Sequence, residues 1–299
     1  MDDELKQWIQ DLPPEAKQKF EDKLSKAFSY EPKAAIFGKT GVGKSSLTNA
    51  LFGKDICKIS DVAACTREPK EVFMNLSGES KGIKLMDVPG IGESKEKDQE
   101  YYRLYAEILK ECDMVLWVLK ADDRTFTSDE DFYNTCMKEY INAGKPFAVA
   151  INQVDKIEPC REFFQNNETL SDKQLENIDK KILNVLRQFD LKATQVIPVS
   201  AHYEYNLDTL TLALVDNLPA DKKFQTINNM EEKIQKNEKV KEEKGNAFTQ
   251  FITELIEFLP IPEASKSLGK TAVKVLSNVV STGVEFGAKV ITNIISWFK

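Results

Sequence analysis

The strongest structural signal in this chain is Gly38-Lys39-Thr40-Gly41-Val42-Gly43-Lys44-Ser45. It matches the pattern G-x-x-x-x-G-K-[ST], in which a glycine-rich loop joins a strand to a helix. The flanks fit this context, because the apolar run 34–37 predicts a strand and the stretch 44–52 predicts a helix. A chance glycine-rich turn would not be expected to have both flanks. We therefore expect a phosphate-binding loop.

The chemistry of such a loop follows from its backbone. Glycines let consecutive N–H groups surround phosphate oxygens, and the N-terminus of the following helix adds a favourable dipole. Lys44 is expected to reach the β- and γ-phosphates as a catalytic group, and the Ser45 hydroxyl is expected to bind Mg²⁺. The expected nucleotide-binding residues here are Gly38, Lys39, Thr40, Gly41, Val42, Gly43, Lys44, Ser45 and Ser46.

Outward from the loop, short apolar runs alternate with amphipathic stretches. The runs are 34–37, 72–76, 83–87, 114–120, 147–152 and 195–200, and the helix-like stretches are 44–52, 98–111, 128–143, 171–189 and 206–218. This alternation predicts an α/β fold with a six-stranded, mostly parallel sheet and helices on both faces. The short gap through Ser77-Gly78-Glu79 predicts that the second and third strands form a hairpin.

A second motif lies at the end of the third predicted strand, in Asp87-Val88-Pro89-Gly90. Asp87 is placed to make a further contact with Mg²⁺, through a water molecule. Gly90 gives the backbone the freedom to respond to a γ-phosphate. Both residues therefore belong to the expected site.

The motif Asn152-Gln153-Val154-Asp155 favours guanine over adenine. An Asp155 carboxylate accepts hydrogen bonds from guanine N1–H and from the 2-amino group. Adenine lacks this donor pair, so a buried Asp155 would stay unpaired beside ATP. Ser200-Ala201 ends the last predicted strand, which places the Ala201 N–H to meet guanine O6. The expected base-binding residues are Asn152, Gln153, Asp155, Ser200 and Ala201.

These motifs, with Thr66 in the stretch AACTREP (63–69), resemble the G1 to G5 boxes of the Era/TrmE-like bacterial small GTPases. The stretches SDVAACTREP (60–69), DVPGIGES (87–94), LWVLKADDR (116–124) and TSDEDFY (127–133) are also similar to the often prophage-borne YfjP-like GTPases of enterobacteria. The resemblance spans about residues 30–220. It implies a Ras-like P-loop GTPase fold, GTP and GDP as ligands, and Mg²⁺ as cofactor.

The resemblance also assigns roles to individual residues. It implies that Thr66 is the switch threonine that meets Mg²⁺ and the γ-phosphate. The expected catalytic positions are then Lys44, Thr66 and Gly90, and the expected Mg²⁺ ligands are Ser45, Thr66 and Asp87.

Three residues depart from the family pattern. Gln153 replaces a lysine whose stem packs over the base, which predicts lower affinity with guanine specificity retained by Asp155. Ile91 stands where Ras-like enzymes carry a water-orienting glutamine, so slow intrinsic hydrolysis is expected. Gly41 stands where potassium-activated relatives carry an asparagine, which disfavours potassium activation.

Composition and charge indicate which classes of partner and which compartment to expect. The 299 residues carry a formal net charge of −7, which disfavours nucleic acid as a main partner. The five cysteines are scattered without a CxxC pair, which favours a reducing, cytoplasmic compartment. The sequence shows no secretory signal and no apolar window of 18 residues, so no transmembrane helix is expected.

The chain is expected to contain four parts. They are an N-terminal helical extension (1–32), a G domain (33–219), a charged linker or helix (220–246), and an amphipathic C-terminal helical region (247–299). For the last part, three interpretations stay open: a hairpin packed on the rest of the chain, peripheral contact of residues 260–299 with the inner membrane, or self-association.

Several functions are compatible with these observations. The first is a GTP-hydrolysing switch that works with a homodimer partner or an effector protein. The second is a membrane-associated, dynamin-like or interferon-inducible-like GTPase, whose C-terminal helices bind lipid or one another. A third is a module that binds GTP without hydrolysing it, and a fourth is a ribosome-associated, Era-like GTPase, which rests on fold analogy alone.

Overall fold

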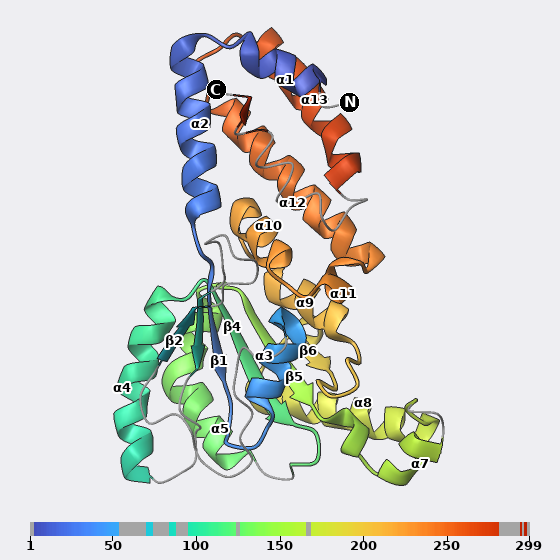
Figure 1. Cartoon of the computed structure of the whole chain (residues 1–299). Coiled ribbons are helices and arrows are strands. Elements are labelled where there is room, and N and C mark those ends of the chain that lie inside the picture. The colour runs from blue at the N-terminus through green and yellow to red at the C-terminus, as the bar shows by residue number, and fades with distance from the viewer. Residues whose placement is uncertain are drawn as a thin grey trace. The chain divides into compact units, whose positions relative to one another are not determined.

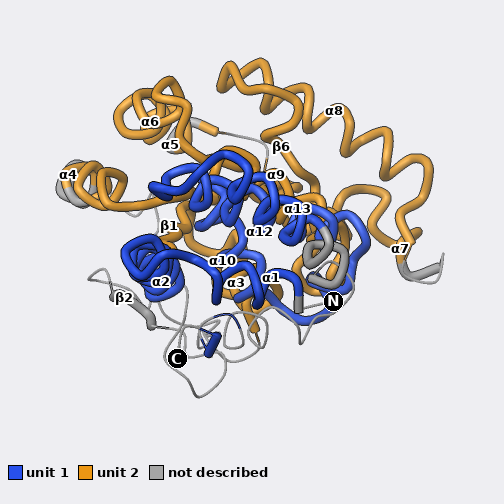
Figure 2. Tube along the Cα trace, turned by 90° about the horizontal axis from the view of Figure 1, so that it is seen from above, with its two compact units in different colours: residues 1–31, 77–81, 219–299 blue, residues 32–76, 82–218 orange. Residues whose placement is uncertain are grey.

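The computed structural model describes residues 3–53, 70–73, 84–87, 95–123, 126–165, 169–280, 294 and 296–297. The chain divides into two compact units (Figure 2). The unit that we call the sheet unit holds residues 32–76 and 82–218, and the unit that we call the helical unit holds residues 1–31, 77–81 and 219–299.

The sheet unit is built on a six-stranded sheet with the order β2-β3-β1-β4-β5-β6 (Figure 1). The strands are β1 (Lys33–Phe37), β2 (Lys70–Phe73), β3 (Lys84–Asp87), β4 (Met114–Lys120), β5 (Phe147–Asn152) and β6 (Val196–Pro198). Only the β2–β3 pair is antiparallel. This arrangement confirms the predicted Ras-like α/β fold, and it brings the carboxyl ends of β1, β4, β5 and β6 to one edge.

Helices of the sheet unit match the predicted stretches closely, except that α7 was not predicted. They are α3 (Lys44–Phe52), α4 (Lys95–Glu111), α5 (Thr127–Phe132), α6 (Lys138–Asn142), α7 (Cys160–Gln165), α8 (Asp172–Phe189) and α9 (Leu207–Val215). The predicted helix over 128–143 contains a π-helical turn, Tyr133–Met137, between α5 and α6. Such a turn accommodates an extra residue within a helix, which hydrophobic periodicity alone does not reveal.

Strand alternation divides the sheet unit into two faces. Val115, Trp117 and Leu119 of β4 join one buried cluster with side chains of α4, α5, α6 and α8. Trp117 is fully buried there, with its ring 4.7 Å from that of Phe189 and 5.9 Å from that of Phe132. On the other face, α9 contacts β4, β5 and β6, and α3 contacts α9. The sheet is therefore covered on both faces.

The helical unit joins the two ends of the chain. It contains α1 (Asp3–Gln10), α2 (Pro14–Ser29), α10 (Ala220–Asn228), α11 (Glu232–Gln235), α12 (Glu238–Glu257) and α13 (Glu263–Val280). Residues 220–246, expected as a charged linker or helix, form helices here. The shared core is lined by Leu5, Ile9, Phe20, Leu24, Phe28, Phe224, Phe248, Ile252, Ile256 and Val273.

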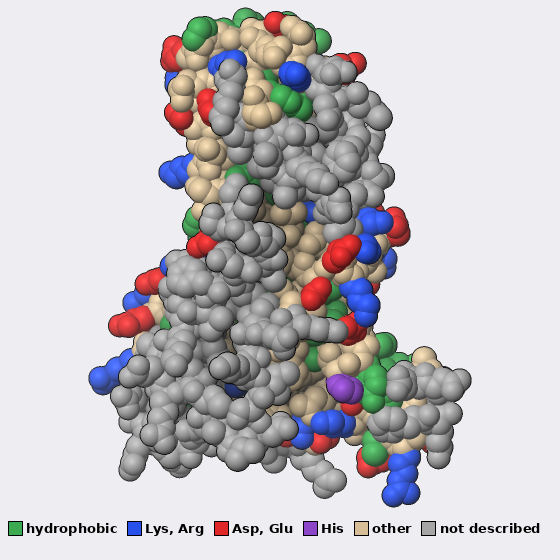
Figure 3. All heavy atoms as spheres, in the orientation of Figure 1, with side chains coloured by type: hydrophobic (Ala, Val, Ile, Leu, Met, Phe, Trp, Pro, Cys, Tyr) green, Lys and Arg blue, Asp and Glu red, His purple; other side chains and the backbone are tan. Residues whose placement is uncertain are grey.

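The surface carries charges of both signs. On the face drawn in Figure 3, described acidic and basic side chains are intermixed. Many form exposed pairs one helical turn apart, such as Lys180 with Glu176. Among the described residues, no helix has the length and apolar character needed to cross a bilayer.

Candidate functional site

The loop between β1 and α3 takes a conformation that requires glycine. Gly38, Gly41 and Gly43 have φ values of 147°, 83° and 89°. A Cβ atom on Gly38 would come within 2.4 Å of the Val118 carbonyl oxygen, and one on Gly43 within 2.5 Å of Asn152 Nδ2. The glycines therefore allow both the left-handed turns and the close approach of the loop to its neighbours.

Lys44 lies over this loop. Its Nζ donates to the carbonyl oxygens of Gly38, at 2.9 Å, and Lys39, at 3.1 Å. Ser45 and Ser46 follow in the first turn of α3, where helix geometry leaves backbone N–H groups without intrahelical acceptors. The same short loop thus carries an ammonium group and leads into a helix N-terminus, a combination that fits an anion such as a phosphate.

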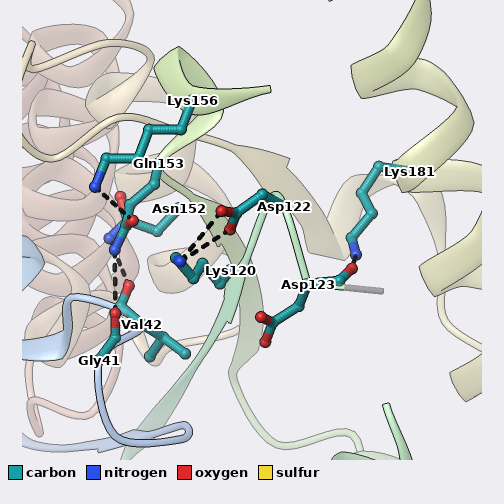
Figure 4. Close-up of polar contacts among 9 residues, drawn as sticks. All are labelled: Gly41, Val42, Lys120, Asp122, Asp123, Asn152, Gln153, Lys156 and Lys181. Carbon is teal, nitrogen blue, oxygen red and sulfur yellow. Dashed lines mark hydrogen bonds and ion pairs between the residues drawn. The ribbon is translucent and has the colours of Figure 1, made fainter. Parts of the chain in front are cut away.

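Asn152, at the end of β5, connects the loop to the segment after β6. Its side chain is buried, with Nδ2 donating to the Val42 carbonyl at 2.9 Å (Figure 4). Its Oδ1 accepts from the Ala201 backbone N–H at 3.1 Å. Both ends of the amide are therefore used, and the side chain holds two sequence-distant segments in register.

Asp155 follows in a short 3₁₀ helix, Val154–Lys156, and is 7% exposed. Its Oδ1 accepts a hydrogen bond of 2.6 Å from the Ser200 hydroxyl. The Ser200 Oγ in turn accepts from the Tyr203 backbone N–H at 3.3 Å. The carboxylate is therefore oriented by the residue directly before Ala201.

Gln153, which follows Asn152 in the guanine motif, makes a second contact with the glycine-rich loop. It has a left-handed φ of 66°, and its Nε2 donates to the Gly41 carbonyl at 3.2 Å. The ammonium of Lys156 donates to Gln153 Oε1 at 3.0 Å (Figure 4). Sequence reasoning missed Lys156, although its position directly after Asp155 was the available signal.

Lys39 has a different environment from the one expected of a phosphate ligand. Its ammonium pairs with the carboxylate of Asp129 in α5. Thr40 and Gly41, the next residues of the loop, are exposed. No local sequence pattern indicates this pair, because its members lie on separate elements.

The hydrolytic residues are less completely described. Thr66, Gly90 and Ile91 lie outside the described residues. The backbone of Asp87 ends β3 and pairs with Ile36 of β1, two residues before Gly38. Of the three expected Mg²⁺ ligands, the structure thus describes the backbone of Asp87 and also Ser45, which lies at the first turn of α3.

Comparison with known proteins agrees with this geometry. Residues 33–153 match the model of a family described as 50S ribosome-binding GTPase. Two uncharacterised proteins of Escherichia coli K12 are similar: YkfA, 40% identical over 217 residues, and YfjP, 35% identical over 217 residues. Each of these alignments covers 73% of this chain and 72% of the relative. The predicted resemblance to YfjP-like GTPases is confirmed.

Era proteins are more distant relatives. GTPase Era of Aquifex aeolicus is 31% identical over 188 residues, which cover 62% of this chain and 56% of that protein. A crystal structure of Era in complex with MgGDPNP and nucleotides 1506–1542 of 16S ribosomal RNA is 28% identical. It covers 63% of this chain and 57% of its own, with a TM-score of 0.45.

Proposed function

Because this chain belongs to the family of YkfA and YfjP, and its residues 33–153 match the P-loop GTPase model described as 50S ribosome-binding GTPase, we propose that it is a molecular switch controlled by GTP hydrolysis. It is a GTP hydrolase whose ligands are GTP and GDP with Mg²⁺. The proposal itself concerns the switch role and the residues that bind and hydrolyse the nucleotide. The observation that carries it is the carboxylate of Asp155, held by Ser200 beside Ala201 and linked through Asn152 to the glycine-rich loop.

The base site in this proposal selects guanine by hydrogen bonding. Asp155 accepts from the guanine N1–H and 2-amino groups, and the Ala201 N–H, which donates to Asn152 Oδ1 in the structure, shares its hydrogen bond with O6. Asn152 sets the distance between base site and phosphate site, because it binds the backbone of both. ATP would leave the buried carboxylate with its Ser200 hydrogen bond but without the two donors of guanine, and sites of this kind discriminate by a factor on the order of 10⁴.

The phosphate site uses the loop from Gly38 to Ser46. Lys44 exchanges its two loop carbonyls for phosphate oxygens, and the Ser45 hydroxyl contributes to the Mg²⁺ site. Bound Mg²⁺ would neutralise charge that develops on the phosphates. In this proposal Thr66 and Gly90 respond to the γ-phosphate, and Thr66 and Asp87 would contribute to the Mg²⁺ site, Asp87 through a water molecule.

Hydrolysis without a partner is expected to be slow, because Ile91 has no polar atom with which to orient water. A dimer partner or an effector protein then supplies the missing group. Phosphate release measured over a range of protein concentrations tests this point. A rate per molecule that rises with concentration supports a dimer, and a constant rate supports a separate effector.

Nucleotide selectivity tests the base site. Calorimetry with Mg²⁺ should show binding of GTP and GDP but not ATP. Asp155→Asn should lose guanine binding and gain binding of xanthosine triphosphate, because an amide donor matches the extra carbonyl of xanthine. The exposed Asp179→Asn on α8 is the matched control and should leave all affinities unchanged. Equal binding of ATP and GTP by the wild type would contradict the proposal.

A second candidate function is nucleotide-controlled contact with lipid or with another copy through the helical unit. Two large apolar side chains of this unit are exposed, Phe258 at 72% and Leu268 at 67%. Flotation with anionic vesicles, using wild type and Phe258→Ser/Leu268→Ser, tests lipid binding, and sedimentation tests self-association. Identical behaviour of both proteins in both assays would exclude this candidate.

A further inference from the structure

Two stretches that stand out in the sequence meet in a single buried ion pair. Lys39 is the second residue of the glycine-rich loop, and Asp129 belongs to TSDEDFY, to which the nucleotide site assigns no role. In the structure the Lys39 ammonium pairs with Asp129 Oδ2, and the side chains are 20% and 2% exposed. The loop is thus connected to the first turn of α5.

The burial of this pair makes each member depend on the other. Burial raises the pKa of Asp129, while the hydrogen bond and charge of Lys39 act in the opposite direction. The second oxygen, Oδ1, has no hydrogen-bond partner among the described residues. If Lys39 left to bind a phosphate, an unpaired carboxylate would remain in the interior, which is strongly unfavourable.

Helix α5 is itself packed into the core of the sheet unit. Phe132, at its last turn, is fully buried, and its ring lies 5.1 Å from that of Phe37 and 5.9 Å from that of Trp117. Phe37 is the residue directly before the loop. The loop is therefore held by the core at its start and by Asp129 one residue after Gly38.

The position of Lys39 also bears on Lys44. The Lys44 ammonium is bound by two carbonyls, those of Gly38 and Lys39. A side chain that fixes Lys39 also fixes the carbonyl of the same residue. Freeing Lys39 would thus change where the ammonium of Lys44 is held.

We propose that the Lys39–Asp129 ion pair anchors the glycine-rich loop to α5, so that both are positioning residues for nucleotide binding and Lys39 is not a phosphate ligand. This inference rests on the proposed function of the loop. The sequence alone placed Lys39 among the nucleotide-binding residues of the loop and assigned no partner to its side chain.

Lys39 as an anchor and Lys39 as a phosphate ligand predict opposite effects of substituting Asp129. The affinity and dissociation rate of fluorescent GDP, with Mg²⁺, are measured at 10–15 °C below unfolding for wild type, Lys39→Met, Asp129→Leu and the double variant. An anchor predicts that each single substitution weakens binding by about tenfold or more, and that the double variant recovers to within about threefold of wild type. A phosphate-binding Lys39 predicts normal binding by Asp129→Leu and no recovery in the double variant, and this result would overturn the proposal.

Controls separate the anchor from other causes. Thermal unfolding of each variant shows whether the ion pair serves folding alone. In that case the stability of the single variants would fall while the folded protein kept its GDP affinity, and this outcome would also count against the anchor. Asp129→Asn replaces Asp129→Leu if the latter does not fold, with a weaker effect in the same direction. Lys180→Met and Glu176→Leu, from an exposed pair on α8, should have no effect.

The wild type separates failure of the proposed function from failure of the anchor. If the wild type bound no GDP, both would fail. If the wild type bound GDP and none of the Lys39 and Asp129 variants changed this binding, the anchor alone would be refuted.

Discussion

The indole ring of Trp8 lies directly against Gly269. A Cβ atom on Gly269 would come within 2.6 Å of two ring carbons, and the indole N–H donates to the Ser265 carbonyl at 2.8 Å. This contact joins α1 to α13, from opposite ends of the chain. It is possible only because position 269 has no side chain.

Gly269→Ala is therefore expected to destabilise the helical unit, although alanine favours helix. The added methyl group forces Trp8 to move and weakens its hydrogen bond, and overpacking of this kind costs about 1–3 kcal/mol. Urea unfolding followed by tryptophan fluorescence measures the change. Ser267→Ala, at an exposed position two residues earlier, should be close to neutral. Equal stability of the two variants would show that Trp8 adjusts freely.

Asn152→Ala is expected to weaken both folding and GTP binding. The substitution leaves the Val42 carbonyl and the Ala201 N–H without their partner, and each buried unsatisfied group costs about 1–3 kcal/mol. Calorimetry and urea unfolding provide the two measurements. The exposed Asn142→Ala is the control. A loss of stability without loss of GTP affinity would contradict a link between base and phosphate sites.

Lys156 is expected to support nucleotide binding through Gln153. Lys156→Ala removes the hydrogen bond that orients the Gln153 amide toward Gly41, and the loss of one such bond predicts about 3- to 10-fold weaker GDP binding. In a Gln153→Lys background the same substitution should matter little, because the lysine at 153 would contact the loop itself. If Lys156→Ala had equal effects in both backgrounds, the two side chains would act independently.

Lys244 in α12 gives the protein a pH-dependent stability. The side chain is 2% exposed, its Nζ donates to Gln235 Oε1, and burial lowers its pKa to about 8. The unfolded chain binds the Lys244 proton more tightly than the folded protein does. Burial of the charged ammonium therefore lowers the free energy of unfolding in full below pH 8, and this cost is lost as the pH rises toward the pKa of the unfolded chain, near 10.5. The shift corresponds to about 3 kcal/mol.

Lys244→Met should consequently stabilise the protein at pH 7 and lose this advantage by about pH 10.5. The comparison is made by urea unfolding at several pH values. Comparing the variant with wild type at each pH cancels the titration of other groups. Lys239→Met, an exposed change on the same helix, should show no pH-dependent difference. A constant stability difference between Lys244→Met and wild type across this range would refute the assignment.

Local sequence patterns predicted most of the sheet unit. The strand before Gly38 and the helix after Lys44 were placed nearly to the residue, because glycine spacing and apolar periodicity are local properties. Strand β2 begins at Lys70 instead of residue 72, and the π-helical turn after Phe132 was not predicted. Both depend on how side chains pack against other elements.

The glycine-rich loop, the succession of strands and helices along the chain, and the guanine motif could all be recognised from the sequence, because each is defined by residues that lie close together along the chain. Tertiary structure alone decided that Lys39 pairs with Asp129, that Asn152 connects two loops, and that Trp8 packs on Gly269. The physical reason is that these contacts join residues far apart in sequence. Their energies depend on burial and shape, which exist only once the core has formed.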